Sequence, residues 1–177
     1  MIRFINNSTD EEFKQNISNY IDLQKTIDGM IYTSVILGGD NIVKNIMWLT
    51  FDGQHWFSSM YDMDGTWGIS WSGNVKNEYC DNIVSETSGN KLWKRIYSLY
   101  KEDIAKRYFS LRTNILSLDN IKEQFTAFNN KIPNFVREAE KQKWTTVPSQ
   151  ETNNLEQIFD FATIRLAYLD NLMLSYL

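Results

Sequence analysis

The fold is decided by one stretch, which reads Asp40-Asn-Ile-Val-Lys-Asn45, Ile46-Met-Trp-Leu-Thr-Phe51, Asp52-Gly53, Gln54-His-Trp-Phe-Ser-Ser-Met-Tyr61 and Asp62-Met-Asp64. Two apolar, aromatic-rich runs flank an Asp-Gly pair, which is the strongest short signal for a β-hairpin. A hairpin returns the chain to the point where it started. We therefore expect four polar residues to converge at one end of the ribbon: Asp40, Asn45, Asp62 and Asp64.

Helical patterns flank this hairpin on both sides. One helix is predicted to start at Ser8-Thr9-Asp10, and a second runs from about Asp22 until Gly38-Gly39 ends it. Residues 65–90 are rich in Gly, Asn and Ser and predict a long irregular segment, and from Lys91 onward apolar residues recur at helical spacing. The sequence therefore predicts a single domain over residues 1–177 that is mainly α with a small β-hairpin.

The polar residues around the hairpin suggest a specific chemistry. In the catalytic lobe of protein kinases a base Asp is followed by an Asn, two short strands and a metal-binding Asp, and Asn45 is likewise five residues after Asp40. Mg²⁺ prefers oxygen ligands, so Asn45, Asp62 and Asp64 are the candidate metal ligands, and Asp40 is the candidate base. Lys44 either contacts a phosphate or is simply solvated. The alternative for each Asp pair is an ordinary turn, because Asp and Asn side chains hydrogen-bond to nearby backbone.

Longer motifs resemble a known family. They are Gly39-Asp40-x4-Asn45, Tyr61-Asp-Met-Asp-Gly-Thr-Trp-Gly68, Trp71-Ser-Gly73, Leu92-Trp93-Lys-Arg95, Arg107-Tyr108-x3-Arg112, Ile132-Pro133 and Arg165-Leu-Ala-Tyr-Leu-Asp170. Together they resemble the CotH kinase family, and more narrowly the CotH-like domains of tail-associated minor structural proteins in phages and prophages of Gram-positive bacteria. The resemblance implies the large, C-terminal lobe of an atypical protein kinase. It also implies ATP with Mg²⁺ or Mn²⁺ as cofactors, and a protein acceptor or phage tail proteins as partners.

Two elements of a complete kinase are missing from the sequence, the Gly-rich phosphate loop and a Val-Ala-Ile-Lys-like strand. By the resemblance, the chain is then the C-terminal half of a CotH-like domain without its ATP-clamping N-terminal lobe. The first functional hypothesis is the catalytic half of a Mg-ATP-dependent protein phosphotransferase, inactive as an isolated fragment. The alternative is a non-catalytic tail or baseplate domain that serves assembly or binds cell-wall polysaccharide. Trp67 and Trp71 either stack on sugar rings in that role or belong to the core.

Composition excludes several other classes. Eighteen basic and 22 acidic residues give a net charge of -4, which argues against a nucleic-acid-binding protein. No apolar run reaches the length of a membrane span. The single cysteine, Cys80, excludes an internal disulfide, is expected to be partly buried, and suits synthesis in the bacterial cytoplasm, with the virion as a final location. His55 is expected to point away from the acidic cluster, and Arg107 and Arg112 are expected to brace the acidic loop.

Overall fold

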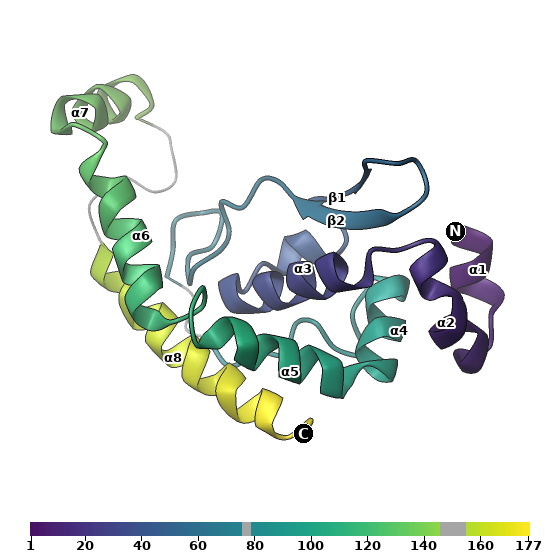
Figure 1. Cartoon of the computed structure of the whole chain (residues 1–177). Coiled ribbons are helices and arrows are strands. Elements are labelled where there is room, and N and C mark those ends of the chain that lie inside the picture. Colours follow the sequence, from purple (N-terminus) through teal and green to yellow (C-terminus); the bar gives the residue numbers. More distant parts are fainter. Residues whose placement is uncertain (76–78, 146–154) are drawn as a thin grey trace.

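The computed structural model describes residues 1–75, 79–145 and 155–177 (Figure 1). The described residues form eight α-helices, two short 3-10 helices and one antiparallel pair of strands. In chain order these are α1 (Ile2–Asn7), α2 (Asp10–Asn16), η1 (Ile17–Asn19), α3 (Leu23–Ile36), η2 (Gly39–Ile42), β1 (Ile46–Thr50), β2 (Trp56–Met60), α4 (Lys91–Leu99), α5 (Lys101–Arg112), α6 (Leu118–Asn130), α7 (Asn134–Lys143) and α8 (Leu155–Leu174). The predicted fold class, mainly α with one hairpin, is confirmed.

The predicted helix starts have the expected caps. Thr9 and Glu12 form a reciprocal capping box at α2, and the Asp22 side chain accepts a hydrogen bond from the N–H of Lys25 at the start of α3. The end of α3 differs in detail from the prediction. The residue in the left-handed conformation is Leu37, with φ of 55°, and not one of the two glycines that follow it. A leucine there is strained, and its burial in the core compensates for that strain.

The hairpin turn is longer than the Asp-Gly pair alone. Thr50 pairs with Trp56, so residues 51–55 form the connection. The Asp52 carboxylate accepts hydrogen bonds from the N–H groups of Gln54 and His55, at 2.8 Å each. Gly53 has φ of 76°, which suits glycine. The Asp side chain therefore organises the turn through local hydrogen bonds.

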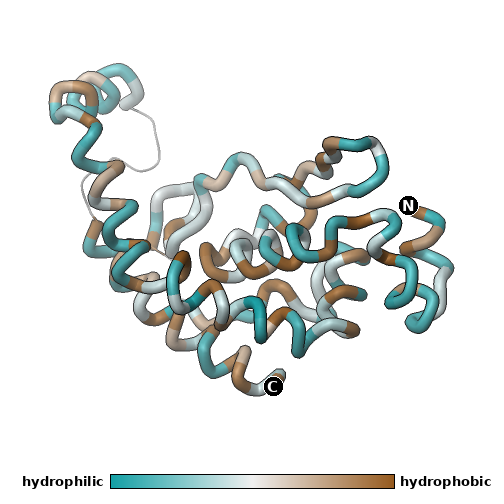
Figure 2. Tube along the Cα trace, in the orientation of Figure 1, coloured by the Kyte–Doolittle hydropathy of each residue, from teal (hydrophilic) through white to brown (hydrophobic). Residues whose placement is uncertain are grey.

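The hairpin lies on one side of α3, while α5 and α8 pack on the other (Figure 1). Strand β2 is the strand that joins the body: the N–H of Trp56 donates to the carbonyl of Tyr20, and the carbonyl of Trp56 accepts from the N–H of Asp22. Hydrophobic and hydrophilic positions alternate along the helices (Figure 2). The core includes fully buried side chains from α2, α3, α4, α5 and α8, namely Phe13, Ile31, Trp93, Tyr108 and Phe161.

Arginines cross-link the helices. Arg107 on α5 forms two hydrogen bonds to Asp28 on α3, at 2.7 and 2.9 Å, and Arg112 pairs with Asp170 on α8. The prediction that Arg107 and Arg112 brace the acidic loop is therefore wrong. Each arginine is on the face of α5 that meets a neighbouring helix, where an acidic residue is within reach.

Two peripheral features complete the fold. Helices α6 and α7 project from the body as an arm, and α7 has no buried residue (Figure 1). Cys80 is exposed, so the prediction that its thiol is partly buried is wrong. Within the described residues, no helix combines the length and the apolar character that a membrane crossing requires.

Candidate functional site

A pocket of about 170 Å³ lies where the hairpin starts and ends. Asp40 reaches it from η2, directly after α3, whereas Asp62 and Asp64 come from the chain that leaves β2. The lining consists of Gly39, Asp40, Asn41, Asp62, Asp64, Gly65, Ser70 and Trp71. The hairpin reverses the chain, and it thus brings Asp40, Asp62 and Asp64 to one pocket.

Asn45 does not line this pocket but lies behind it. Its amide Nδ2 donates to the carbonyl of Asp62 at 3.2 Å, and its Oδ1 accepts no hydrogen bond from the described residues. The fully buried Asn41 donates to the carbonyls of Asn45 and Tyr61, at 3.0 and 2.9 Å. These two amides fix the start of the hairpin to its end. Asn41 was assigned no role from the sequence, although an Asn beside Asp40 was a signal for backbone pairing.

The three carboxylates of the pocket are exposed and weakly engaged. Asp40 is 65% exposed, and its Oδ2 lies 3.4 Å from Nζ of Lys44, which is itself 75% exposed. Among the described residues, Asp64 accepts one hydrogen bond, from the N–H of Gly65 at 2.8 Å. Asp62 has φ of 53°, a left-handed conformation that Asp and Asn tolerate better than most residues. Groups this loosely held remain available to a ligand.

Asp62 and Asp64 are the pocket carboxylates that the sequence suggests as oxygen donors for Mg²⁺. Among the described residues, no three His, Cys, Asp or Glu side chains are grouped closely enough to hold an ion by themselves. Mg²⁺ at nucleotide sites needs only one or two carboxylates, because substrate phosphates and water complete its shell. Asp62 and Asp64, which line the pocket, therefore fit a metal that arrives with phosphate, and not a metal held by the protein alone; Asn45 does not line it.

The two undecided tryptophans have different environments. Trp67 packs edge-on against Phe125 and Phe161, with ring centroids 4.9 and 6.2 Å away, so it belongs to the core. Trp71 is 73% exposed and lines the pocket. The turn that carries Trp71 is ordered, since the N–H of Ser70 donates to the carbonyl of Asn74 at 2.9 Å. Trp71 is therefore an exposed ring on a defined support beside the carboxylates.

A buried arginine supports the segment that follows the pocket. The side chain of Arg165, on α8, is fully buried. Its Nε donates to the carbonyl of Ser34, and its Nη1 donates to the carbonyls of Tyr79 and Asp81, all at 2.8 Å. Burial lowers the pKa of Arg165 to about 10, so it remains charged at neutral pH. The sequence motif contained Arg165, but its role was missed; the signal was an Arg at core spacing between Ala162 and Leu169.

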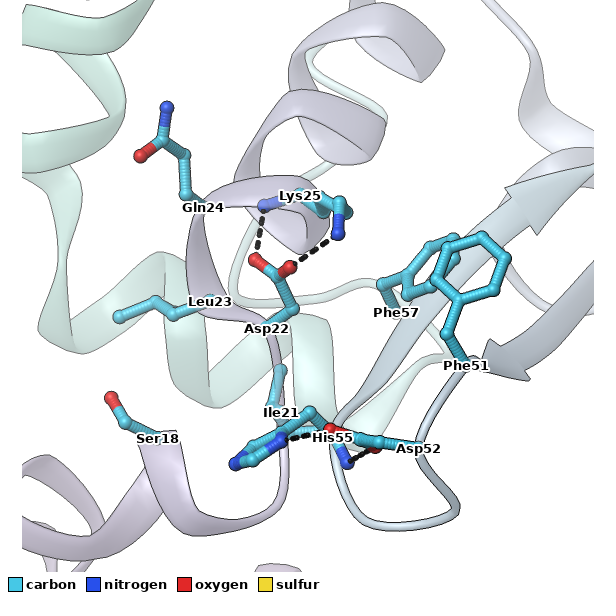
Figure 3. A pocket seen from close by; sticks show the side chains of 10 residues that line it. All are labelled: Ser18, Ile21, Asp22, Leu23, Gln24, Lys25, Phe51, Asp52, His55 and Phe57. Carbon is cyan, nitrogen blue, oxygen red and sulfur yellow. Dashed lines mark hydrogen bonds and ion pairs between the residues drawn. The ribbon is translucent and has the colours of Figure 1, made fainter.

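A second pocket, of about 450 Å³, lies at the other end of the hairpin (Figure 3). His55 lines it and pairs with Asp52 at 2.6 Å, so the prediction that His55 points away from the acidic cluster is confirmed. Lys25 pairs with Asp22 at 2.8 Å and lies 4.9 Å from the centre of the Phe57 ring. Asp22 and Asp52 are each paired with a neighbouring side chain, so this pocket lacks the unengaged carboxylates of the first pocket.

Comparison with known proteins identifies a family. A family model described as CotH kinase protein matches residues 1–169. A search of curated proteins finds no match for the chain. The matched range contains both pockets, the hairpin and Arg165.

Proposed function

The chain belongs to the CotH kinase family, and from that premise we propose that its acidic pocket serves Mg-ATP-dependent phosphoryl transfer to a protein hydroxyl. The observation that carries the proposal is the placement of Asp40, Asp62 and Asp64 in one pocket at the base of a hairpin. Phosphoryl transfer depends mainly on positioning and on the neutralisation of charge, and an open acidic pocket with a metal fits both needs.

Each residue has a role in this proposal. Asp62 and Asp64, with Oδ1 of Asn45, would hold Mg²⁺, which neutralises phosphate charge when bound. Asp40 orients the acceptor hydroxyl and accepts its proton while the new O–P bond forms, and the leaving oxygen keeps its electron pair on ADP. Lys44 is free to turn from Asp40 to a phosphate, because their ion pair is exposed and long.

The proposal includes a second lobe. The 177-residue sequence has no Gly-rich loop of the kind that covers nucleotide phosphates in protein kinases. We therefore propose that this pocket is the C-terminal half of the site, and that residues 1–177 by themselves transfer no phosphate.

The experiment compares nucleotide binding and transfer in two chains, this one and one extended upstream by the length of a lobe. Asp62→Asn is the informative variant, because Asn keeps the left-handed backbone while removing the charge. Asp160→Asn on α8 is the control, as it removes the same charge from an exposed position on a helix. We expect Mg-ATP to bind the extended chain and to label an acceptor protein, and only Asp62→Asn to abolish both. An extended chain that binds no nucleotide would contradict the proposal.

A second candidate, non-catalytic binding of cell-wall polysaccharide in a phage tail or baseplate, is favoured by Trp71. Its exposed ring beside carboxylates suits stacking on a sugar whose hydroxyls hydrogen-bond to the acids. Trp71→Ala distinguishes the candidates. Polysaccharide binding that is lost in Trp71→Ala, in a protein without nucleotide binding, would favour this second function.

A further inference from the structure

Strand β1 has an open edge. The N–H of Tyr61 donates to the carbonyl of Asn45, and in the observed register the odd-numbered residues Met47 and Leu49 therefore exchange hydrogen bonds with β2. The even-numbered residues Ile46, Trp48 and Thr50 direct their N–H and C=O groups away from β2. Within the described part of the chain, these three residues make no other backbone hydrogen bond.

The opposite side of the hairpin is already occupied. There Trp56 is hydrogen-bonded to Tyr20 and Asp22, and α3 packs against β2. Only the β1 edge is available to a further strand.

The edge carries none of the usual protection against strand pairing. Proteins protect such edges with charged residues, proline or bulges, and the run from Ile46 to Phe51 has none of these. Instead, Met47, Leu49 and Phe51 expose apolar side chains on one face, and Phe51 is 88% exposed. An unprotected apolar edge of this kind is typical of a strand that pairs with another chain.

We propose that two copies of this chain associate through their β1 edges, in antiparallel register about a two-fold axis at Trp48. In this register Ile46 of one copy faces Thr50 of the other, and Met47 faces Leu49. Because the outward residues are symmetric about Trp48, all their N–H and C=O groups find partners. Such a closed, self-complementary contact is the usual form of a homodimer interface.

Charge complementarity supports a second copy as the occupant. Lys44 and Asp52 flank β1 on either side, so this register, continued two residues beyond the strand, brings Lys44 of one copy near Asp52 of the other, whose side chain is 53% exposed although it also caps the hairpin turn. Lys44 is 75% exposed and its ion pair to Asp40 is long, so this contact competes with the phosphate contact proposed for the same side chain. These two cross-pairs act against the repulsion between two chains that each carry a net charge of -4.

The first test is sedimentation equilibrium under reducing conditions over a range of protein concentrations. We expect a monomer–dimer equilibrium, with a dissociation constant that rises at least tenfold in M47K/L49K, since that variant puts like charges opposite each other. The matched control I115K/F128K places two lysines at exposed apolar positions away from the hairpin and should leave the constant unchanged. K44D should weaken the dimer several-fold. Circular dichroism checks that each variant is folded.

The second test fixes the register. Residues 47 and 49 of opposite copies form a non-hydrogen-bonded pair, whose Cα separation of about 4.5 Å permits a disulfide. In a Cys80→Ser background, M47C/L49C should form a covalent dimer on mild oxidation, whereas M47C alone should link poorly, because it faces Leu49 and not its own copy. A chain that stays monomeric at about 1 mM, or a dimer insensitive to M47K/L49K, would overturn the proposal. Equal cross-linking by M47C alone would overturn this register.

Discussion

The hairpin with its acidic pocket and the helical base, which α5 and α8 form beneath α3, use the same residue types in opposite ways. In the base, charged and hydroxyl groups pair with groups on neighbouring helices: Tyr108 donates to Asp170 at 2.7 Å, and Arg112 pairs with the same carboxylate. In the pocket, Asp40 and Asp62 are exposed, and within the described ranges their carboxylates have at most one weak partner. The comparison teaches that the base holds the fold, whereas the pocket carboxylates are held in place by backbone and remain free to bind.

The largest expected effect comes from the base. Replacing Arg165 by Met removes the donor for the carbonyls of Ser34, Tyr79 and Asp81. Leaving the buried carbonyl of Ser34 and the two less buried carbonyls unpaired, in the site of a buried guanidinium, should lower the free energy of unfolding by about 3 kcal/mol or more. Urea denaturation measures the loss, with the exposed Arg3→Met as the control. Equal stability of the two variants would mean that buried pairing is not what holds the base.

The next effect concerns the hydroxyl of Tyr108. Burial and the hydrogen bond to Asp170 raise the pKa of Tyr108, so the phenol stays protonated and donates throughout the neutral range. Tyr108→Phe should lower the free energy of unfolding by about 1–2 kcal/mol. Tyr61→Phe removes the same hydroxyl from an exposed residue at the hairpin and should change it by less than about 0.5 kcal/mol. Equal losses of stability in Tyr108→Phe and Tyr61→Phe, measured by thermal or urea unfolding, would contradict the difference proposed between the base and the hairpin.

A smaller and pH-dependent effect is expected at the hairpin turn. The hydrogen bond from His55, followed by the backbone N–H groups, holds the pKa of Asp52 well below its usual range. A carboxylate with a lowered folded-state pKa stabilises the protein above its unfolded pKa of about 4, and this contribution is lost as the pH falls further. Asp52→Asn should therefore melt below the wild type at pH 7, and the two melting temperatures should approach each other toward about pH 2. A difference that persists at low pH would show that the ionised form is not responsible.

The smallest expected effect lies in the pocket itself. Without ligand, Asp62→Asn and Asp64→Asn should change the free energy of unfolding by less than about 0.5 kcal/mol, because neither carboxylate is buried. Chemical denaturation without nucleotide or metal tests this. A loss as large as that of Tyr108→Phe would make these carboxylates structural and would remove the contrast between the two regions.

The sequence predicted the hairpin and the convergence of its flanking acids because both follow from local rules. An Asp-Gly pair between apolar runs reverses the chain, and reversal by itself brings Asp40 near Asp62. The same rules located the helix starts at Thr9 and Asp22, since a side chain caps the helix that directly follows it.

Contacts between distant elements could not be predicted in the same way. Arg107 and Arg112 were assigned to the acidic loop, but their partners are Asp28 and Asp170, and only the packing of the helices reveals which face of α5 meets them. The register of the hairpin could not be predicted from the Asp-Gly pair either. The connection between the strands is longer than that pair, and the Asp52 side chain organises it. The roles of Asp40, Lys44, Asn45, Asp62 and Asp64 in phosphoryl transfer stay predictions.

The long reach of Arg165 imposes an order on the folding of the chain. Residues 79 and 81 are fixed by a guanidinium that lies more than eighty residues further along the sequence. During synthesis the hairpin can form as soon as it emerges, but the carbonyls of Tyr79 and Asp81 lack their guanidinium donor until α8 has been made and has docked. We therefore expect the segment after the pocket to remain sensitive to proteases in nascent chains that stop before residue 165. Its protection should appear in one step when α8 is complete.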